Sequence, residues 1–303
     1  MSASTSPGTG KLYGVELVCC IGGFPRSSFY AKQGLPESAA TTSEPTPKKQ
    51  KRGPKTILSD NELLDLIRAD LKASPWVGEG HRKVHARLRM SQTLPVGRKR
   101  VLRIMRENNL LSPSRCRIAN DGAHDGTIIT QVPGELWATD GTQVMTVDDG
   151  NVWIFTAVEH WNAECVGWHV AKEGNRFAAL QPISMAIQKL YGATGPSVAR
   201  GLSLRMDHGS QYTDDDFQRQ IKYWGIAPSF GLVGQPETNG VAERFFRTLK
   251  EQAVYGRIFK NVREVQDAIC TFVKTYNTAW RLEKNGYLTP FEMRDQLEPK
   301  VAA

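Results

Sequence analysis

From residue 135 onward, hydrophobic and polar positions alternate in short segments that are typical of β-strands. Five such segments follow one another: ELWATDGTQVMTV, NVWIFTAVEHW, ECVGWHVAKE, LSLRM and IAPSFGL. Helical spacing occupies four longer segments: RFAALQPISMAIQKLYG, DDDFQRQIKYWG, VAERFFRTLKEQAVYG and VREVQDAICTFVKTYNTAW. Three consecutive strands, then alternating helices and strands, predict a mixed five-stranded sheet with flanking helices. We also expect a hairpin turn at residues 148–151 and a helix cap formed by Thr213 with Asp216.

Residues 57–118 carry a helical pattern instead. Ser59 and Glu62 form a capping-box signature before the periodic segment LLDLIRADL. HRKVHARLRM and GRKRVLRIMRENN follow, and the second of these gathers three apolar residues on one face: Val101, Ile104 and Met105. Three short helices, the last of them basic, favour a small helix-turn-helix-like DNA-binding module, although any basic surface helix has a similar pattern.

The sequence as a whole suggests four parts. Residues 1–34 contain short apolar stretches that predict a small helical segment, and residues 35–56 are rich in Pro, Ser, Thr and Lys, which is typical of a flexible linker. We therefore expect a helical DNA-binding domain at 57–118 and a catalytic domain at 125–300.

Charge is concentrated in one of these parts. The formal net charge is +8, yet residues 48–118 alone hold 18 basic and 6 acidic side chains. This local excess favours contact with nucleic acid over a merely solvated surface. The five cysteines lack the spacing of a zinc site, which fits a reducing compartment, and no apolar run is long enough to span a membrane.

Three acidic residues stand at places where a sheet can bring them together: Asp140 in the first strand, Asp207 at the end of the fourth, and Glu243 in the first turn of a helix. Clustered carboxylates repel one another, and divalent cations relieve that repulsion. Two Mg²⁺ ions (or Mn²⁺) held there can serve phosphodiester chemistry. By contrast, Asp148 and Asp149 have the pattern of turn residues, and residues 214–216 that of acids at a helix start.

The blocks WATDGT, LRMDHGSQYT and GQPETNGVAERFFRTLKEQ resemble the three acidic motifs of a DDE transposase, and the 35 residues between Asp207 and Glu243 match the gap shared with retroviral integrases. The chain is similar to the second-frame protein of the bacterial insertion-sequence family three. FPRSSFYA, HRKVHARLR, YNTAW and GYLTPFEM resemble other segments of that family. The resemblance implies an RNase H-like fold in which Asp140, Asp207 and Glu243 are catalytic metal ligands.

The resemblance also implies a reaction and partners. The family cuts DNA at the ends of its element and joins the freed 3′-OH to another phosphodiester. It implies double-stranded DNA (element ends and target) as substrate, an upstream-frame partner protein, a homo-oligomer on DNA, and action in the bacterial cytoplasm at the nucleoid. The candidate DNA-contacting residues are Arg98, Lys99, Arg103, Arg106, Arg247 and Lys250. Asp214 departs from the family, whose members often carry Ser there.

Two other functions stay open at this point. One is a DNA-binding regulator with an inactive catalytic domain, against which the three intact acids argue. The other is an RNase H-like nuclease acting on RNA–DNA hybrids, against which the basic helical module and the Asp207-to-Glu243 spacing argue.

Overall fold

A computed structural model describes six ranges of the chain: residues 5–23, 25–33, 58–91, 93–112, 128–231 and 240–297. The chain divides into two compact units, Met1–Thr56 and Ile57–Ala303. The first unit contains α1 (Val15–Ile21) and α2 (Arg26–Gln33), in the segment predicted to be helical. The predicted linker at 35–56 lies outside the described residues.

The second unit begins with three helices, α3 (Asp60–Ala73), α4 (His81–Ser91) and α5 (Arg98–Glu107). The predicted capping box is present, because Ser59 Oγ accepts a hydrogen bond from Glu62 N and the Glu62 carboxylate accepts one from Ser59 N. The apolar faces of the three helices form one cluster: Leu63, Ile67, Val84, Leu88, Val96, Val101, Ile104 and Met105. This is the helical module expected from the sequence.

The remainder is built on one five-stranded sheet. Its strands are β1 (Leu136–Thr146), β2 (Gly150–Glu159), β3 (Cys165–Ala171), β4 (Ser203–Met206) and β5 (Ala227–Phe230). The spatial order is β3-β2-β1-β4-β5; β1 to β3 are antiparallel neighbours, whereas β4 and β5 run parallel to β1. All five predicted strands are confirmed, and the arrangement is the RNase H-like fold.

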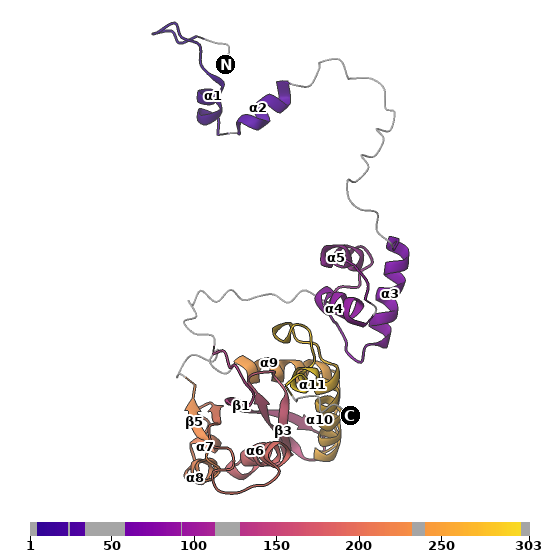
Figure 1. Cartoon of the computed structure of the whole chain (residues 1–303), viewed down its shortest axis with the longest axis vertical. Helices are drawn as coiled ribbons and strands as arrows, with labels where there is room; N and C mark the ends of the chain where they lie inside the picture. The colour runs from indigo at the N-terminus through magenta and orange to yellow at the C-terminus, as the bar shows by residue number, and fades with distance from the viewer. Residues whose placement is uncertain are drawn as a thin grey trace. The chain divides into compact units, whose positions relative to one another are not determined.

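Helices cover both faces of the sheet (Figure 1). One face packs against α6 (Arg176–Tyr191), α7 (Ser210–Thr213) and α8 (Asp215–Tyr223). The other packs against α9 (Gly240–Leu249) and α10 (Val262–Ala279). The chain closes through η3 (Glu283–Asn285) and α11 (Pro290–Asp295). Because strand side chains alternate between faces, neighbouring residues of β2 such as Ile154 and Phe155 enter different clusters.

The packing of α6 on β3 requires a glycine. A Cβ atom at Gly167 would lie 1.8 Å from the carbonyl oxygen of Pro182, so no other residue fits without a shift of backbone. Pro182 lies inside α6, at the proline noted in the sequence. The close approach buries this helix against the edge strand β3 and its neighbour β2.

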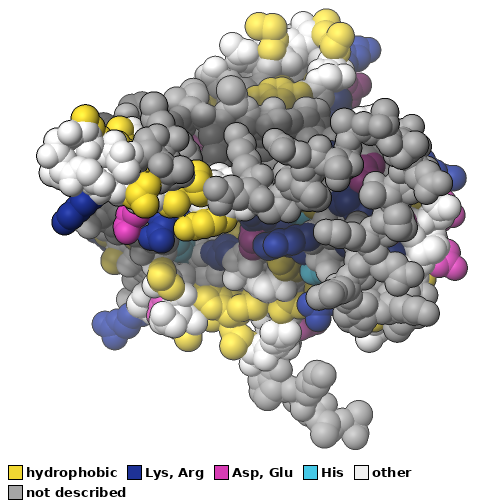
Figure 2. Space-filling view, turned by 90° about the horizontal axis from the view of Figure 1, so that it is seen from above, with side chains coloured by type: hydrophobic (Ala, Val, Ile, Leu, Met, Phe, Trp, Pro, Cys, Tyr) yellow, Lys and Arg dark blue, Asp and Glu magenta, His cyan; other side chains and the backbone are white. Residues whose placement is uncertain are grey.

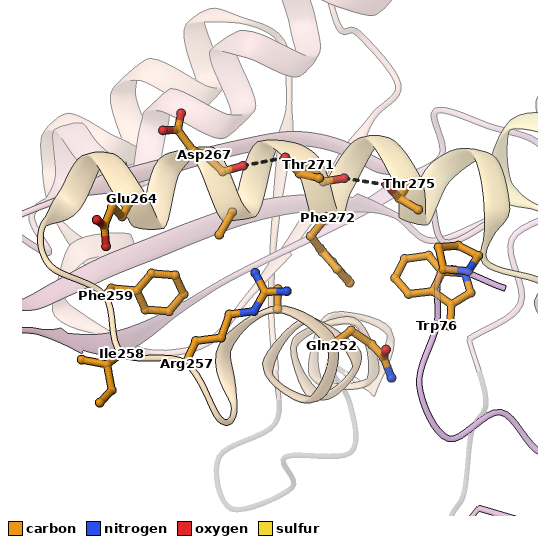
Figure 3. A pocket seen from close by; sticks show the side chains of 13 residues that line it. Trp76, Gln252, Arg257, Ile258, Phe259, Glu264, Asp267, Thr271, Phe272 and Thr275 are labelled. Carbon is orange, nitrogen blue, oxygen red and sulfur yellow. Dashed lines mark hydrogen bonds between the residues drawn. The ribbon is translucent and has the colours of Figure 1, made fainter. Parts of the chain in front are cut away.

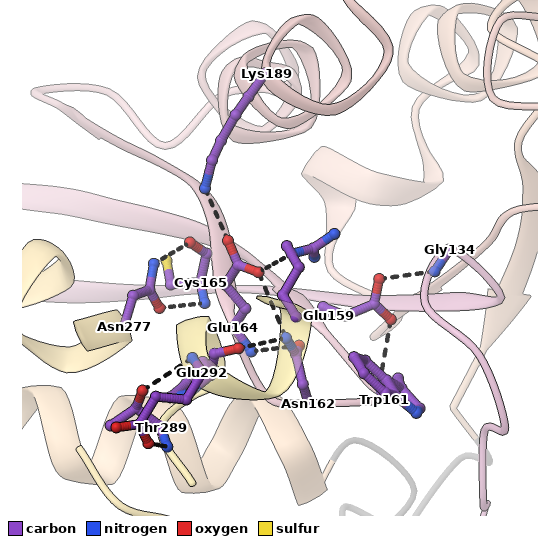
Figure 4. Close-up of polar contacts among 12 residues, drawn as sticks. Gly134, Glu159, Trp161, Asn162, Glu164, Cys165, Lys189, Asn277, Thr289 and Glu292 are labelled. Carbon is purple, nitrogen blue, oxygen red and sulfur yellow. Dashed lines mark hydrogen bonds and ion pairs between the residues drawn. The ribbon is translucent and has the colours of Figure 1, made fainter. Parts of the chain in front are cut away.

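A buried polar network ties the C-terminal turn to the loop between β2 and β3 (Figure 4). Asn162 Nδ2 donates to the carbonyl oxygen of Pro290 at 3.0 Å. Glu164 is 3% exposed in its side chain and pairs with both Lys189 of α6 and Arg294 of α11. The network satisfies polar groups that burial would otherwise leave unpaired, and it holds α11 against the sheet.

One local prediction was wrong. The residue that caps α8 is Asp214 rather than Thr213, since Asp214 Oδ1 accepts a hydrogen bond from Asp216 N at 2.9 Å. The short helical turn α7 lies between Asp207 and this cap. Thr213 belongs to that turn, which leaves Asp214 as the first extended residue before α8.

Candidate functional site

Asp140 and Asp207 are in register on neighbouring strands. Asp140 lies in the middle of β1, opposite Thr156 of β2. On the other side, β1 pairs in parallel with β4, and the last of these pairs joins Ala138 to Arg205. Continuing this register by two residues brings Asp140 beside Asp207, which directly follows β4. Adjacent strands lie about 4.8 Å apart, so the two carboxylates leave the sheet as neighbours.

Glu243 reaches the same neighbourhood from α9. It lies in the first turn of this helix, whose Phe245, Phe246 and Leu249 are buried on the sheet face that also carries Val144 of β1. Side chains of β1 alternate between faces, so Asp140 and Val144 lie on the same side. The helix therefore carries Glu243 over the face to which Asp140 belongs.

The electrostatics of Asp140 connect these residues. Burial above all, together with the charges of Asp207 and Glu243, raises the pKa of Asp140 to about 6, against the opposing effect of a hydrogen bond from Gly141 N. The charge of Lys250 also lowers this pKa. The three carboxylates predicted from the sequence therefore interact electrostatically, and the charges of Asp207 and Glu243 disfavour ionisation of Asp140.

Asp207 is exposed, and local bonds fix its surroundings. Its Oδ1 accepts a hydrogen bond from Gly209 N at 2.9 Å. The neighbouring His208 ring lies flat against Phe230 of β5, with centroids 5.2 Å apart, and its Nε2 is 3.0 Å from the carbonyl oxygen of Gly231. His208 therefore has a local hydrogen-bonding role beside Asp207.

The donor set suits a hard divalent cation. Mg²⁺ prefers carboxylate oxygens, and the three acids supply them from three different elements. Within the described residues, no three His, Cys, Asp or Glu side chains lie close enough to hold a metal ion as they stand. The fit thus rests on donor chemistry and on the raised pKa of Asp140, a carboxyl group whose repulsion by two others a cation would relieve.

A π-helix directly follows α9. The sequence predicted one continuous helix through VAERFFRTLKEQAVYG, but α9 ends at Leu249 and η2 (Lys250–Val254) has π geometry, with Tyr255 N donating to the carbonyl oxygen of Lys250 at 2.7 Å. Such bulges are rare and often accompany functional sites. Lys250 stands at its start, within electrostatic reach of Asp140, while Arg247 is exposed on α9.

The basic residues of α5 fall into two groups, one ion-paired within the helical module and one exposed. Arg103 pairs with Asp60 at 2.6 Å and with Glu107 at 2.9 Å, which makes it part of the module's own structure. Three other cations of α5 are exposed and have no ion pair within the described part of the chain: Arg98, Lys99 and Arg106. Figure 2 shows Lys and Arg side chains beside exposed hydrophobic ones on one face of the molecule.

Sequence reasoning missed one residue close to the acids. Tyr212 of α7 is fully buried, and burial raises its pKa well above the ordinary value, with the charge of Asp140 as a further cause. Its ring meets Phe217 of α8 edge to face at 5.3 Å. Alternation along HGSQYT gave no signal for this, since a tyrosine in a presumed loop is usually exposed.

Family models match most of the second unit. Two models described as an integrase core domain match residues 131–236 and 224–290, and one described as an HTH-like domain matches residues 59–117. Residues 131–290 form an integrase core domain. All three carboxylates lie within the 131–290 region that these two models cover, and the helical module coincides with the HTH-like match.

Curated relatives of this integrase-core chain are transposases. It is 27% identical over 181 residues to transposase InsD of insertion element IS2A/D/F/H/I/K from Escherichia coli, which is 58% of this chain and 60% of that protein. The InsD of insertion element IS2-9 from Escherichia coli strain K12 matches at the same identity over 58% of its length. The chain thus spans about 60% of the length of the curated relatives it matches.

Solved structures with a similar chain come from retroviruses. A chain of the simian T-cell lymphotropic virus intasome in complex with the PP2A regulatory subunit B56 gamma is 16% identical, with a TM-score of 0.48, over 72% of this chain and 76% of that one. The BIV integrase catalytic core domain is 24% identical, with a TM-score of 0.38, over 55% and 96%. Separately, each helix in the described ranges is too short or too polar to span a bilayer.

Proposed function

We propose that this chain is a transposase that cuts and rejoins DNA with the carboxylates of Asp140, Asp207 and Glu243. The observation that carries the proposal is the register of β1 and β4, which aligns Asp140 with Asp207, together with the influence of Glu243 on the pKa of Asp140. The integrase core domain and similarity to InsD transposases support it.

The proposed reaction has two steps. Water attacks a phosphodiester at the element end and breaks its bond to the 3′ oxygen, which leaves as a 3′-OH. That 3′-OH then attacks a second phosphodiester, and the 3′ oxygen of the attacked strand leaves as a hydroxyl. Asp140, Asp207 and Glu243 would hold two Mg²⁺ or Mn²⁺ ions, which would supply positive charge at the reacting phosphate. The carboxylates need no nucleophilic role, because the attacking groups are water and a 3′-OH of the DNA.

Basic residues would hold the DNA. Lys250, whose charge lowers the pKa of Asp140, would meet a backbone phosphate near the cut, and Arg247 lies one turn before it. Arg98, Lys99 and Arg106 would meet the backbone at the helical module, so binding should weaken steeply with salt. We further propose double-stranded element ends and target DNA as substrates, a homo-oligomer that brings two ends together, an upstream-frame partner, and action on chromosomal DNA in the bacterial cytoplasm.

The test is strand transfer with Mg²⁺, using labelled DNA ends taken from both flanks of this reading frame. We expect wild type to cut and join them and Asp207→Asn to lose both steps. Asp215→Asn is the matched control, because Asp215 is also an exposed acid but lies in the first turn of α8. Joining by Asp207→Asn at the wild-type rate would remove Asp207 from the site.

An inactive DNA-binding regulator is the second candidate. The exposed cations of α5 favour it independently of the acids. It gains if the wild-type protein binds the flanking DNA but cuts neither strand when the upstream partner is supplied.

A further inference from the structure

The helical module and the catalytic domain meet through the loop between α3 and α4, residues 74–80. Trp76 in this loop is only 8% exposed and belongs to the hydrophobic cluster of α9 and α10. Its indole meets the ring of Trp280 edge to face at 4.9 Å and that of Phe272 at 6.0 Å. One aromatic side chain of the helical module is thus embedded in the core of the catalytic domain.

Gln252 adds a directional contact to this apolar one. Its Oε1 accepts a hydrogen bond from Val77 N at 3.1 Å, and its Nε2 donates to the carbonyl oxygen of Val77 at 3.0 Å. The pair uses both main-chain groups of Val77, so it fixes the loop in one register. Figure 3 shows Trp76 and Gln252 among the side chains that line one groove.

The loop is also held rigid from the side of the helical module. Glu79 is 4% exposed and is bound by Arg87 at 2.6 Å and by Ser74 Oγ at 2.7 Å. The Lys83 ammonium lies over the Trp280 ring, 2.8 Å from its centroid. A buried and ion-paired carboxylate is costly to move, because its partners would lose their charge compensation. The loop therefore has little freedom to present Trp76 differently.

The contact residue Gln252 lies two positions after Lys250 in the π-helix η2. Lys250 is within electrostatic reach of Asp140, whereas Gln252 holds the loop of the helical module. The first residue of this short helix therefore acts electrostatically on Asp140, and its third residue contacts the helical module. The π geometry shifts the side chains after Lys250 around the helix axis, so the two residues face different neighbours.

We propose that Trp76 and Gln252 are positioning residues that keep the helical module docked in one register on the catalytic domain while DNA is bound. DNA held by α4 and α5 then reaches the carboxylates of Asp140, Asp207 and Glu243 at a fixed separation, which sets the phosphodiester that is cut. This inference rests on the proposed function for its effect on cutting, and on docking alone for its effect on the loop.

Docking is tested by hydrogen–deuterium exchange on the full chain, with and without a random-sequence duplex of about 40 base pairs. In wild type we expect residues 74–83 to stay protected when the duplex binds. In Gln252→Ala their amides should exchange about tenfold faster, as expected for the loss of two hydrogen bonds. Gln181→Ala, at an exposed glutamine of α6, is the matched control and should leave the loop unchanged. Rapid exchange of residues 74–83 in DNA-bound wild type would overturn the proposal, since the module would then undock to bind.

Positioning is tested by mapping cuts at nucleotide resolution with Mg²⁺ on the flanking DNA. Wild type should cut one phosphodiester, whereas Gln252→Ala should keep the wild-type melting temperature and duplex affinity but spread its cuts over neighbouring positions. Trp76→Phe should restore the single position that Trp76→Ala loses. An unchanged single position in Gln252→Ala would refute the positioning role. Failure of wild type to cut would refute the proposed function instead, and the exchange measurement would still decide whether the module stays docked.

Discussion

Arg176 joins the start of α6 to the start of α8 through Asp214 and Asp216. Its Nε lies 3.3 Å from Asp214 Oδ1 and 2.9 Å from Asp216 Oδ2. Asp214 is therefore both the N-cap of α8 and one member of an ion-pair cluster. This gives a structural role to the residue at which the chain departs from the insertion-sequence family it resembles.

The effect of replacing Asp214 on stability should depend on the loss of the helix cap more than on the loss of charge. Asp214→Ser keeps an oxygen for Asp216 N, so its free energy of unfolding should lie within a few tenths of a kcal/mol of the wild-type value, since Ser and Asp are comparable N-caps. Asp214→Ala removes the cap and should cost about 1 kcal/mol. Urea unfolding of both variants measures the difference. Equal losses in the two would mean that the Arg176 pair, rather than the cap, carries the effect.

The basic residues of α5 should differ in how much they contribute to DNA binding. Lys99→Gln should lower affinity for duplex DNA of any sequence and reduce the slope of log affinity against log salt by about 1, as for one lost phosphate contact. Arg103→Gln should leave that slope nearly unchanged but lower the melting temperature, because Arg103 is engaged by Asp60 and Glu107. Salt titrations monitored by fluorescence anisotropy measure both slopes. An equal reduction by the two variants would show that Arg103 leaves its ion pairs to bind DNA.

Lys83 should make stability depend on pH in the alkaline range. Burial lowers its pKa to about 7, although Glu79 acts in the opposite direction, while Arg87 adds to the lowering. A lysine in the unfolded chain has a pKa of about 10.4. Between the two pKa values the unfolded chain holds a proton that the folded chain lacks. The free energy of unfolding therefore rises with pH, by at most about 1.4 kcal/mol per pH unit.

The control for this is Lys83→Met, which removes the titrating group and keeps the volume. Unfolding free energies of wild type and variant, measured from pH 7 to pH 10, should converge as pH rises, with the variant nearly flat. Parallel curves would mean that Lys83 stays charged over Trp280 throughout this range.

Replacing Glu164, the buried carboxylate of the polar network, should lower the free energy of unfolding far more than replacing its half-exposed partner Lys189. Glu164→Gln leaves Arg294 without its carboxylate and should destabilise the chain by about 3 kcal/mol, the range for a broken buried pair. Lys189→Met should cost less than about 1 kcal/mol, because this lysine is half exposed in its ion pair. Chemical denaturation measures both, and similar losses would show that Lys189 rather than Arg294 compensates Glu164.

Local patterns in the sequence were sufficient for the elements and for the choice of acids. Alternation predicted β1, and helical spacing predicted the buried face of Val101, Ile104 and Met105. The cap of α8 was misassigned because Thr213 and Asp214 are both good N-caps, and only the turn α7 excludes the first. The π-helix was missed because its residues continue a helical pattern without a break.

The role of Trp76 depends on contacts that no local pattern contains. Its partners Phe272 and Trp280 lie about two hundred residues further along the chain. In the sequence it is one tryptophan in the segment ASPWVGEG, whose proline and glycines indicate only a loop. The contact of Gln252 with Val77 likewise joins residues 175 positions apart, and no local pattern indicates it.

The alignment of β1 with β4 makes tolerance to changes in length uneven along the chain. The exposed residues 192–194 after α6 can gain or lose residues while Asp140 and Asp207 remain partners, since pairing rather than chain length aligns them. A single residue inserted between Leu204 and Asp207 would instead turn the second carboxylate to the opposite face of the sheet. Related chains can therefore diverge widely in size between these two aspartates, provided that the last residues of β4 keep their count.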